Sequence, residues 1–204
     1  MVEEQLLSRG IKDSRVLATM AKVRRHLFVA EELRSRAYDD NPLPIGEGQA
    51  ISQPYIVALM VEALGLKGKE RVLEIGTGSG YEAAVLAELC AQVFSIEWVE
   101  DLAIRARVVL ASLGYRNVSI HVGDGTLGWE EHAPYDAVVI SAAAPCIPRP
   151  LIWQLKLDGL MVLPMGEKEL QTLVRIRKER GGLREGYLGE CLFVKLMGAY
   201  GCED

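Results

Sequence analysis

The sequence is poor in the residues that build metal sites and disulfide frameworks. It contains four cysteines and three histidines in 204 residues, and no two cysteines form a C-x-x-C pair. The histidines show no ligand spacing with the cysteines. We therefore expect no metal site and no disulfide framework, and we expect Cys90 to be a small buried apolar residue.

Positive charge is also scarce, and no apolar run is long. The formal net charge of −5 argues against a large binding surface for nucleic acid or for an anionic membrane. The apolar runs stop well short of the roughly 20 residues that span a membrane, and the acidic start MVEEQLLSRG is unlike a signal peptide. We expect a cytoplasmic monomer with no membrane or nucleic-acid partner, folded as one domain because no shift in composition separates two cores.

Short β-rich apolar segments alternate with helical patterns in the middle of the chain. The expected strands are RVLEIG, AQVFSIE, VSIHVGD, YDAVVIS and GLMVLPMG, and the helices between them include YEAAVLAELC and VEDLAIRARVVLASLG. This alternation predicts βαβ units and an α/β fold with a doubly wound, mostly parallel sheet. Ligands of such sheets bind beyond the carboxyl ends of the strands.

The two ends of the chain have a different pattern. The first 37 residues or so look helical, with Asp13 placed to cap SRVLATMAKV. The segment PLPIGEGQAISQP is expected to be an irregular loop, since its prolines and glycines interrupt regular elements, and it leads into the helix PYIVALMVEALGL. Near the C-terminus, LQTLVRIRK and LGECLFVKLMG are expected to be late edge strands joined by a turn in ERGGLREG.

A glycine-rich turn follows the first strand of the alternating region. Gly76, Gly78 and Gly80 lie between that strand and a helix, a layout that brings a ligand close to the backbone. Glu97 ends the next strand, where a carboxylate can accept hydrogen bonds from both hydroxyls of a ribose. Glu74, just before the glycines, would oppose a pyrophosphate but suits an ammonium and a sulfonium. Spacing and charge therefore favour S-adenosylmethionine over a dinucleotide.

For two of the acidic residues the sequence leaves a purely structural role open. In that role, Glu74 would orient the turn without touching a ligand. Asp124, in VGDGT after a later strand, would be an ordinary turn aspartate instead of a contact to adenine.

Four segments together carry a family resemblance: AYDDNPLPIGEGQAISQPYIVALM, VLEIGTGSGYEAAVLAEL, GDGTLGW and PYDAVVISAAAPCIP. They resemble protein-L-isoaspartate (D-aspartate) O-methyltransferases. The resemblance implies a Rossmann-like, S-adenosylmethionine-dependent methyltransferase fold. It also implies a repair activity, in which the free α-carboxylate of L-isoaspartyl or D-aspartyl residues in damaged proteins and peptides is methylated. The ester then closes to a succinimide that can reopen as normal aspartate.

The resemblance implies site residues as well. Ser52 matches the catalytic serine, and Ile51, Gln53, Pro54 and Ser141 match substrate-binding positions. The matched cofactor-binding residues are Glu74, Gly76, Thr77, Gly78, Ser79, Gly80, Glu97, Asp124 and Gly125. Residues 1–68 would hold the N-terminal helices and the substrate loop, residues 69–166 the cofactor-binding core, and residues 167–204 the C-terminal strands. Ala50 and Lys195 stand where the family pattern has threonine and proline.

The expected chemistry explains what the substrate loop lacks. A carboxylate with a pKa of about 4 is already ionised at neutral pH, so its methylation needs no histidine or cysteine as a general base. Ser52 would donate a hydrogen bond to the acceptor, although a plain helix N-cap is its alternative interpretation. The rival functions are a methyltransferase with another acceptor, a nicotinamide-dependent oxidoreductase and a cofactor-binding module without catalysis.

Overall fold

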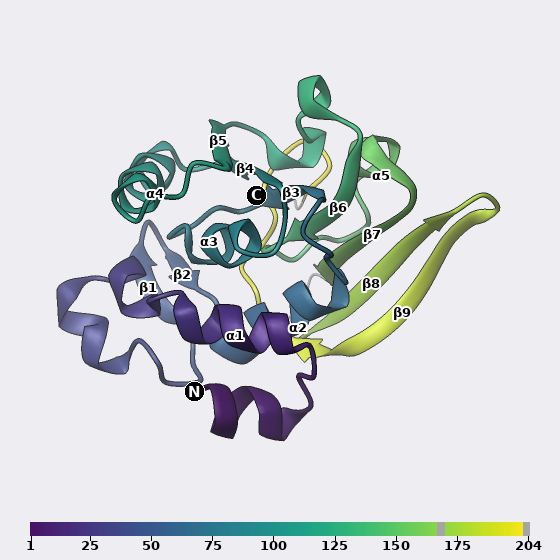
Figure 1. Cartoon of the computed structure of the whole chain (residues 1–204). Coiled ribbons are helices and arrows are strands. Elements are labelled where there is room, and N and C mark those ends of the chain that lie inside the picture. Colours follow the sequence, from purple (N-terminus) through teal and green to yellow (C-terminus); the bar gives the residue numbers. More distant parts are fainter. Residues whose placement is uncertain (167–169, 202–204) are drawn as a thin grey trace.

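A computed structural model of the chain describes residues 1–166 and 170–201. Its main feature is a seven-stranded sheet in the order β5-β4-β3-β6-β7-β8-β9 (Figure 1). The strands are β3 (Arg71–Ile75), β4 (Gln92–Glu97), β5 (Val118–Val122), β6 (Tyr135–Ile140), β7 (Leu155–Met165), β8 (Gln171–Glu179) and β9 (Gly182–Cys191). The first five of these run parallel, and β8 and β9 are antiparallel to their neighbours. The predicted doubly wound, mostly parallel sheet is thus confirmed.

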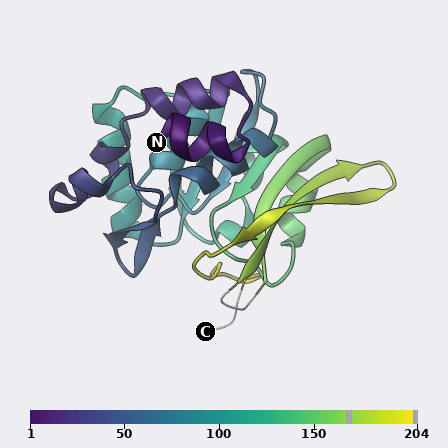
Figure 2. The ribbon, with the colours of Figure 1, turned by 90° about the horizontal axis from the view of Figure 1, so that it is seen from below.

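Helices cover both faces of the sheet (Figures 1 and 2). They are α1 (Ser14–Lys22), α2 (Pro54–Ala63), α3 (Tyr81–Ala87), α4 (Glu100–Ser112) and α5 (Arg149–Gln154), of which α5 was not predicted from the sequence. Short helical turns occupy Val2–Leu6, Leu7–Arg9, Arg25–Phe28, Glu31–Arg36, Gly125–Leu127 and Glu130–His132. Within the described residues, no helix has both the length and the apolar character needed to cross a membrane.

Two apolar cores lie on opposite faces of the sheet because successive side chains of a strand point in opposite directions. In β3, Val72 joins the core beneath α1, α2 and α3, whereas Leu73 joins the core beneath α5. Each strand of the parallel region is therefore apolar on both faces, which is typical of a parallel sheet covered by helices.

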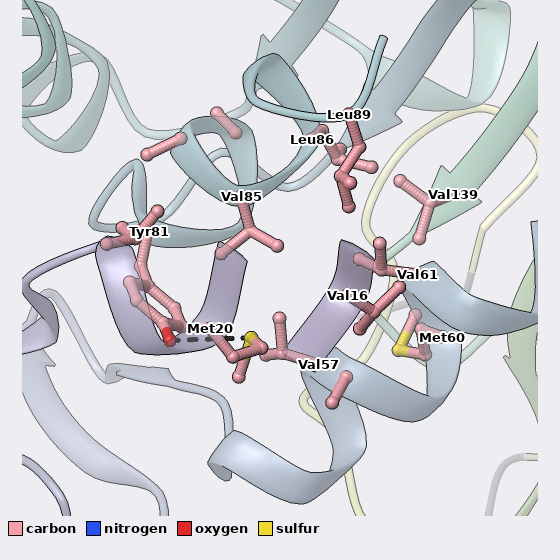
Figure 3. Close-up of a cluster of buried hydrophobic side chains, with 14 of the residues drawn as sticks. Val16, Met20, Val57, Met60, Val61, Tyr81, Val85, Leu86, Leu89 and Val139 are labelled. Carbon is pink, nitrogen blue, oxygen red and sulfur yellow. Dashed lines mark hydrogen bonds between the residues drawn. The ribbon is translucent and has the colours of Figure 1, made fainter. Parts of the chain in front are cut away.

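The N-terminal helices are part of the larger core. Figure 3 shows Val16 and Met20 of α1 in one cluster with Val57 and Val61 of α2 and Val85 of α3. The hydroxyl of Tyr81 lies 3.7 Å from the sulfur of Met20. Asp13 caps α1 as predicted, since its side chain accepts a hydrogen bond from the backbone N–H of Arg15.

The expectation of an irregular loop over Pro42 to Pro54 is wrong. Strand β1 (Leu43–Gly46) pairs with β2 (Gln49–Ile51) as a two-stranded antiparallel hairpin. A small separate hairpin tolerates Pro44 because an edge strand can leave one backbone position without an N–H donor. The tight turn uses positive φ angles at Glu47 and Gly48.

The boundaries of the C-terminal hairpin also differ from the prediction. Strand β9 begins at Gly182 and ends at Cys191, so it includes most of the segment that was predicted as a turn. The hairpin of β8 and β9 projects from the body (Figure 1). The next residues, Leu192 to Met197, leave the hairpin and return to the parallel strands. There the backbone of Lys195 forms an isolated parallel β-bridge with Ala143. Parts of the predicted C-terminal segment, residues 167–169 and 202–204, lie outside the described residues.

A matched pair of substitutions tests the core. Val85 is fully buried in α3, and Val108 is 65% exposed in α4. Val85→Ala should lower the free energy of unfolding by about 2 kcal/mol, because it removes buried methyl groups and leaves a cavity. Val108→Ala should change it by less than about 0.5 kcal/mol. Urea unfolding measures both values, and equal losses would contradict this packing.

Candidate active site

A cavity opens at the carboxyl ends of the parallel strands. It lies where the strand order reverses between β3 and β6, the place where ligands bind in doubly wound sheets. Two backbone hydrogen bonds hold the loops together here, from Gly76 N to Ile96 O and from Ser141 N to Ile75 O, both 2.8 Å long. The residues around it include Ile51, Ser52, Ile75, Gly76, Thr77, Gly78, Ser79, Glu82, Ile96, Glu97, Trp98, Gly125 and Ser141.

The glycine-rich turn forms the floor of the cavity. Gly78 has a φ of 54°, and its N–H donates a 2.7 Å hydrogen bond to Oε2 of Glu97. Gly80 does not line the cavity but is the N-cap residue of α3, with a φ of 86°. A residue with a side chain would be strained in either conformation. The turn therefore presents backbone, with no side chain between it and a ligand.

Glu97 connects the glycine turn to the end of β4. Its second carboxylate oxygen, Oε1, accepts a hydrogen bond of 2.9 Å from the N–H of Val99. A carboxylate has about four acceptor positions, so two remain for a ligand after these two bonds. Glu97 is only 5% exposed, and the two backbone bonds fix its orientation toward the cavity that it lines.

Glu74 lies beneath the turn and does not line the cavity. The Ser95 hydroxyl donates a hydrogen bond to its Oε2 and is also bonded to Thr77 Oγ1. This chain of bonds supports the plainer interpretation, in which Glu74 orients the turn. Its other oxygen, Oε1, is buried without a partner in the described structure. Burial raises the pKa of Glu74 well above its ordinary value.

Glu82 is a site residue that the sequence reasoning missed. It lies in the first turn of α3, is 7% exposed and lines the cavity. Its Oε2 accepts a hydrogen bond from the hydroxyl of Ser141, and its Oε1 has no partner among the described residues. Burial raises its pKa to about 7. The available signal was an acidic residue inside the apolar run YEAAVLAEL, where a buried charge requires a reason.

Asp124 joins two backbone segments and does not line the cavity itself. It accepts hydrogen bonds of 2.8 Å from the backbone N–H groups of Thr126 and Ala199. This geometry agrees with the turn-aspartate interpretation. The neighbouring Gly125 does line the cavity, and a Cβ placed there would lie 2.3 Å from Cγ2 of Ile75.

A second cavity adjoins the first. The two share Ala50, Ser52, Ser141 and Val194, so two serines lie where they meet. Residues from three regions complete the second cavity: Arg9 and Pro42, then Gln53, Tyr55, Ile56 and Leu59, and Leu188 to Phe193.

The expected substrate residues lie around this junction. Gln53 is the N-cap residue of α2, and Pro54 is the buried first residue of that helix. The alternative interpretation of Ser52 as the N-cap is therefore wrong. Ser52 precedes the cap and lines both cavities. Gln53 lines the second cavity and donates a 2.7 Å hydrogen bond to Asp40, whereas Ile51 lines the first.

The segment Val194–Met197 forms a wall that was not predicted. Ala143 N donates to Val194 O at 2.7 Å, and Leu196 N donates to Ala143 O at 2.8 Å. Residues about 50 positions apart thereby meet beside the cavity, and Lys195 lines it. The sequence pattern gave no signal for this return, because apolar residues in LFVKLMG fit an edge strand equally well.

A glycine pair tests the close packing around the cavity. Gly125→Ala should cost about 1–3 kcal/mol of unfolding free energy, since its methyl group overlaps Ile75. Gly181→Ala, in the hairpin turn where no atom lies within 4 Å of the new Cβ, is the control and should cost less than about 0.5 kcal/mol. Denaturant unfolding gives both values. A neutral Gly125→Ala would show that the wall is less tightly packed than the structure indicates.

Stability should also depend on pH through Glu82. The folded protein holds its proton up to about pH 7, whereas an unfolded glutamate loses it near the ordinary value of 4.5. The folded state thus binds more protons in this window, and stability falls as pH rises through it. Glu82→Gln should remove this loss. Its free energy of unfolding should exceed that of the wild type by on the order of 1–3 kcal/mol at pH 8, and by little at pH 5. Urea unfolding at both pH values measures the difference, with the exposed Glu131→Gln as control.

Comparisons with known proteins identify the family of the chain. The family model for protein-L-isoaspartate(D-aspartate) O-methyltransferase matches residues 1–201. A protein-L-isoaspartate O-methyltransferase from Syntrophus aciditrophicus is 55% identical, and the match covers 98% of this chain and 94% of the relative. One from Geobacter metallireducens is 54% identical, with 98% and 94% covered.

Solved structures show the same similarity in three dimensions. A protein-L-isoaspartate O-methyltransferase superimposes with a TM-score of 0.89 at 29% identity, covering 98% of this chain and 67% of that one. A Plasmodium falciparum protein assigned to the same activity, solved with S-adenosyl-L-homocysteine, gives a TM-score of 0.80 at 27% identity with 96% of both chains covered. The chain belongs to the protein-L-isoaspartate(D-aspartate) O-methyltransferase family.

Proposed function

We propose that the protein transfers a methyl group from S-adenosylmethionine to the free α-carboxylate of L-isoaspartyl residues, and also to the side-chain carboxylate of D-aspartyl residues, in damaged proteins and peptides. The observation that carries the proposal is the junction of two cavities at Ser52 and Ser141. One cavity suits the cofactor and the other suits a polypeptide acceptor. Transfer between two bound molecules requires such a junction.

The first cavity fits S-adenosylmethionine in charge and shape. The buried Oε1 atoms of Glu74 and Glu82 lack partners in the described structure, which favours a ligand with cationic groups. Glu97 has acceptor positions left for the two ribose hydroxyls. Apolar side chains of Ile96, Trp98 and other lining residues suit the adenine ring. We therefore assign Gly76 to Ser79, Glu97 and Gly125 to cofactor binding, with Gly80, Glu74 and Asp124 holding the turn and the adenine loop in place.

The second cavity suits an extended polypeptide. It runs from Ser52 along α2 and the end of β9, and both polar and apolar side chains line it. We assign Gln53 and Ser141 to the acceptor side, since both line this cavity, and Ile51 and Pro54 to holding the backbone around Ser52. Ala50 replaces the hydroxyl that the family pattern has here, so Ser52 and Ser141 are the hydroxyl donors that remain at the junction.

In the proposed mechanism the protein aligns the reacting groups. The cofactor supplies an electrophilic methyl group on a positively charged sulfur. Ser52 donates a hydrogen bond to one oxygen of the acceptor carboxylate and orients the other oxygen toward the methyl carbon. The new O–C bond forms as the S–C bond breaks, and no proton moves because the carboxylate is already ionised. Alignment of this kind contributes on the order of 7 kcal/mol or more.

The charge around the junction argues against the nicotinamide-dependent rival. A dinucleotide would bring its pyrophosphate to a turn flanked by the buried carboxyl groups of Glu74, Glu82 and Glu97, which would oppose its negative charge. The rival of a methyltransferase with another acceptor differs only on the side of the second cavity, where Ala50 lies. Methylation of matched isoaspartyl and aspartyl peptides distinguishes this rival from the proposed function.

We also propose the domain organisation of the chain, its location in the cell and its partners. We take residues 1–204 as one methyltransferase domain, because a single core cluster includes Leu6 of the N-terminal turns, Val72 of β3 and Cys191 of β9. The net charge of −5 supports a cytoplasmic protein that acts as a monomer on polypeptides and has no nucleic-acid or membrane partner.

Acceptor specificity tests the function directly. Two peptides that differ only in an isoaspartyl or a normal aspartyl residue are incubated with radiolabelled S-adenosylmethionine. The isoaspartyl peptide should take up label and the aspartyl peptide should not. Labelling of neither peptide, with cofactor binding intact, would reject the proposed acceptor.

The role of Ser52 has its own prediction. Ser52→Ala should lower kcat by about tenfold to a hundredfold, the value of one hydrogen bond to a charged group, with little change in the Kd of the cofactor. Ser112→Ala at the exposed end of α4, where the hydroxyl bonds only its own helix, is the matched control and should retain full activity. An unchanged kcat for Ser52→Ala would remove Ser52 from the mechanism.

A further inference from the structure

An arginine from the N-terminal turns reaches the second cavity. Arg9 ends the turn Leu7–Arg9 and lies between Leu6 and Ile11, which are both fully buried in the larger core. The central carbon of its guanidinium group lies 3.5 Å from the centre of the Tyr55 ring, and both residues line the second cavity. The N-terminal turns thereby supply a cation to the cavity that runs along α2.

The carboxylate of Asp40 holds this arginine in place. Its Oδ2 accepts a hydrogen bond of 2.6 Å from Nη1 of Arg9 and one of 2.7 Å from Nε2 of Gln53. Its Oδ1 accepts a longer bond of 3.3 Å from the backbone N–H of Tyr55. Gln53 and Tyr55 follow Ser52 at the start of α2. Asp40 therefore fixes Arg9 relative to the proposed catalytic residue.

Arg9 keeps hydrogen-bond donors for a ligand. A guanidinium group has five N–H groups, and within residues 1–166 and 170–201 Arg9 donates one hydrogen bond, to Asp40. Its side chain is 44% exposed. The carboxylate of Asp40 offsets its charge, and Glu190 also lines the cavity. Open N–H groups in such an ion pair suit an uncharged acceptor, such as a main-chain carbonyl, better than a second carboxylate.

We propose that Arg9 donates a hydrogen bond to a main-chain carbonyl of the acceptor polypeptide near its isoaspartyl residue, and that Asp40 is the positioning residue that holds Arg9 for this contact. Every polypeptide has such a carbonyl. The contact therefore anchors the acceptor chain without selecting the side chains next to the damaged site. This inference rests on the proposed function, because it takes a polypeptide as the occupant of the second cavity.

The contact should act on acceptor binding and little on the transfer step. The Tyr55 ring covers one face of the guanidinium group, Asp40 binds Nη1, and the buried neighbours of Arg9 fix its backbone. An arginine held in this way loses less side-chain freedom on binding than one that moves freely on the surface. Its removal should therefore raise the KM of the acceptor, with little change in kcat.

A series of isoaspartyl peptides tests the inference on the intact protein. The peptides are acetylated and amidated, keep the free α-carboxylate, and are extended by one alanine at a time on either side of the isoaspartyl residue. KM is measured at saturating S-adenosylmethionine. In the wild type, the step that adds the bound carbonyl should lower KM by about threefold to tenfold, the value of one hydrogen bond at a partly exposed site. Arg9→Met should remove the decrease at that step and leave the other steps unchanged.

Three further variants separate the guanidinium group from its support. Arg9→Lys keeps the charge without the planar fork, so it should recover only part of the decrease. Asp40→Asn keeps the shape of the side chain but loses the charge that holds Arg9, so it should weaken the same step. Arg184→Met removes an exposed arginine whose ion pair with Glu179 lies outside both cavities, and it should give the wild-type series.

A change of side chain in the peptide distinguishes a carbonyl from a carboxylate. Glutamate in place of the alanine at the sensitive step should lower the KM of the wild type by the same factor as alanine. If glutamate gives a larger decrease that Arg9→Met removes, Arg9 binds a carboxylate and the inference is overturned.

The remaining outcomes separate the inference from the proposed function. If no isoaspartyl peptide is methylated although S-adenosylhomocysteine binds, the proposed function fails. If the peptides are methylated but no single step lowers KM in the wild type, the inference is overturned without any variant. It is also overturned if Arg9→Met keeps the decrease, or if it changes the Kd of S-adenosylhomocysteine as strongly as KM. Should Arg9→Met fail to fold, Arg9→Lys decides by the same series, since an undiminished decrease contradicts the inference.

Discussion

Close approach of backbone at the carboxyl ends of β3, β4 and β6 is the constraint on which the site depends. The turn after β3 lies against the loop after β6, and the N–H of Gly78 reaches the carboxylate of Glu97 at the end of β4. Gly125 also allows a close approach of backbone, on the far wall of the cavity, because the methyl group of Ile75 leaves no space there for a side chain. Because three loops are held this closely, their backbone amides and a few acidic side chains line one cavity, and the rest of the fold serves to hold the strand ends in register.

Buried carboxyl groups in and beside this cavity give it its chemical character. Glu74, Glu82 and Glu97 are each less than a tenth exposed, and they come from three successive elements of the chain. Such a cluster disfavours a phosphate-bearing ligand and favours a cationic one, which agrees with the family to which the chain belongs. Ser52 and Ser141 lie at the border where this cavity meets the second cavity, which we propose to bind the acceptor. The cofactor and the acceptor carboxylate thus have separate environments that touch at one place.

The sequence was sufficient for the fold and for the cofactor turn, since periodicity, glycine spacing and the acid after β4 are local signals. It was insufficient where the outcome depended on tertiary contacts. The hairpin of β1 and β2 forms although prolines and glycines suggested a loop, and Leu192 to Met197 return to the cavity although their pattern suits a strand. Glu82 was missed because its role follows from burial against Ser141, 59 residues away, which no local pattern contains. Asp124 was assigned to the adenine, yet its hydrogen bonds hold the backbone of Thr126 and Ala199.

A crystal structure of the protein with S-adenosylhomocysteine and an isoaspartyl peptide would test the central claim most directly, because it locates both reactants relative to Ser52. The account predicts the sulfur in the first cavity, the peptide in the second, and the free α-carboxylate at the junction with one oxygen hydrogen-bonded to Ser52 and the other facing the sulfur. A carboxylate bound away from Ser52, or a cofactor that occupies neither the glycine turn nor Glu97, would contradict it.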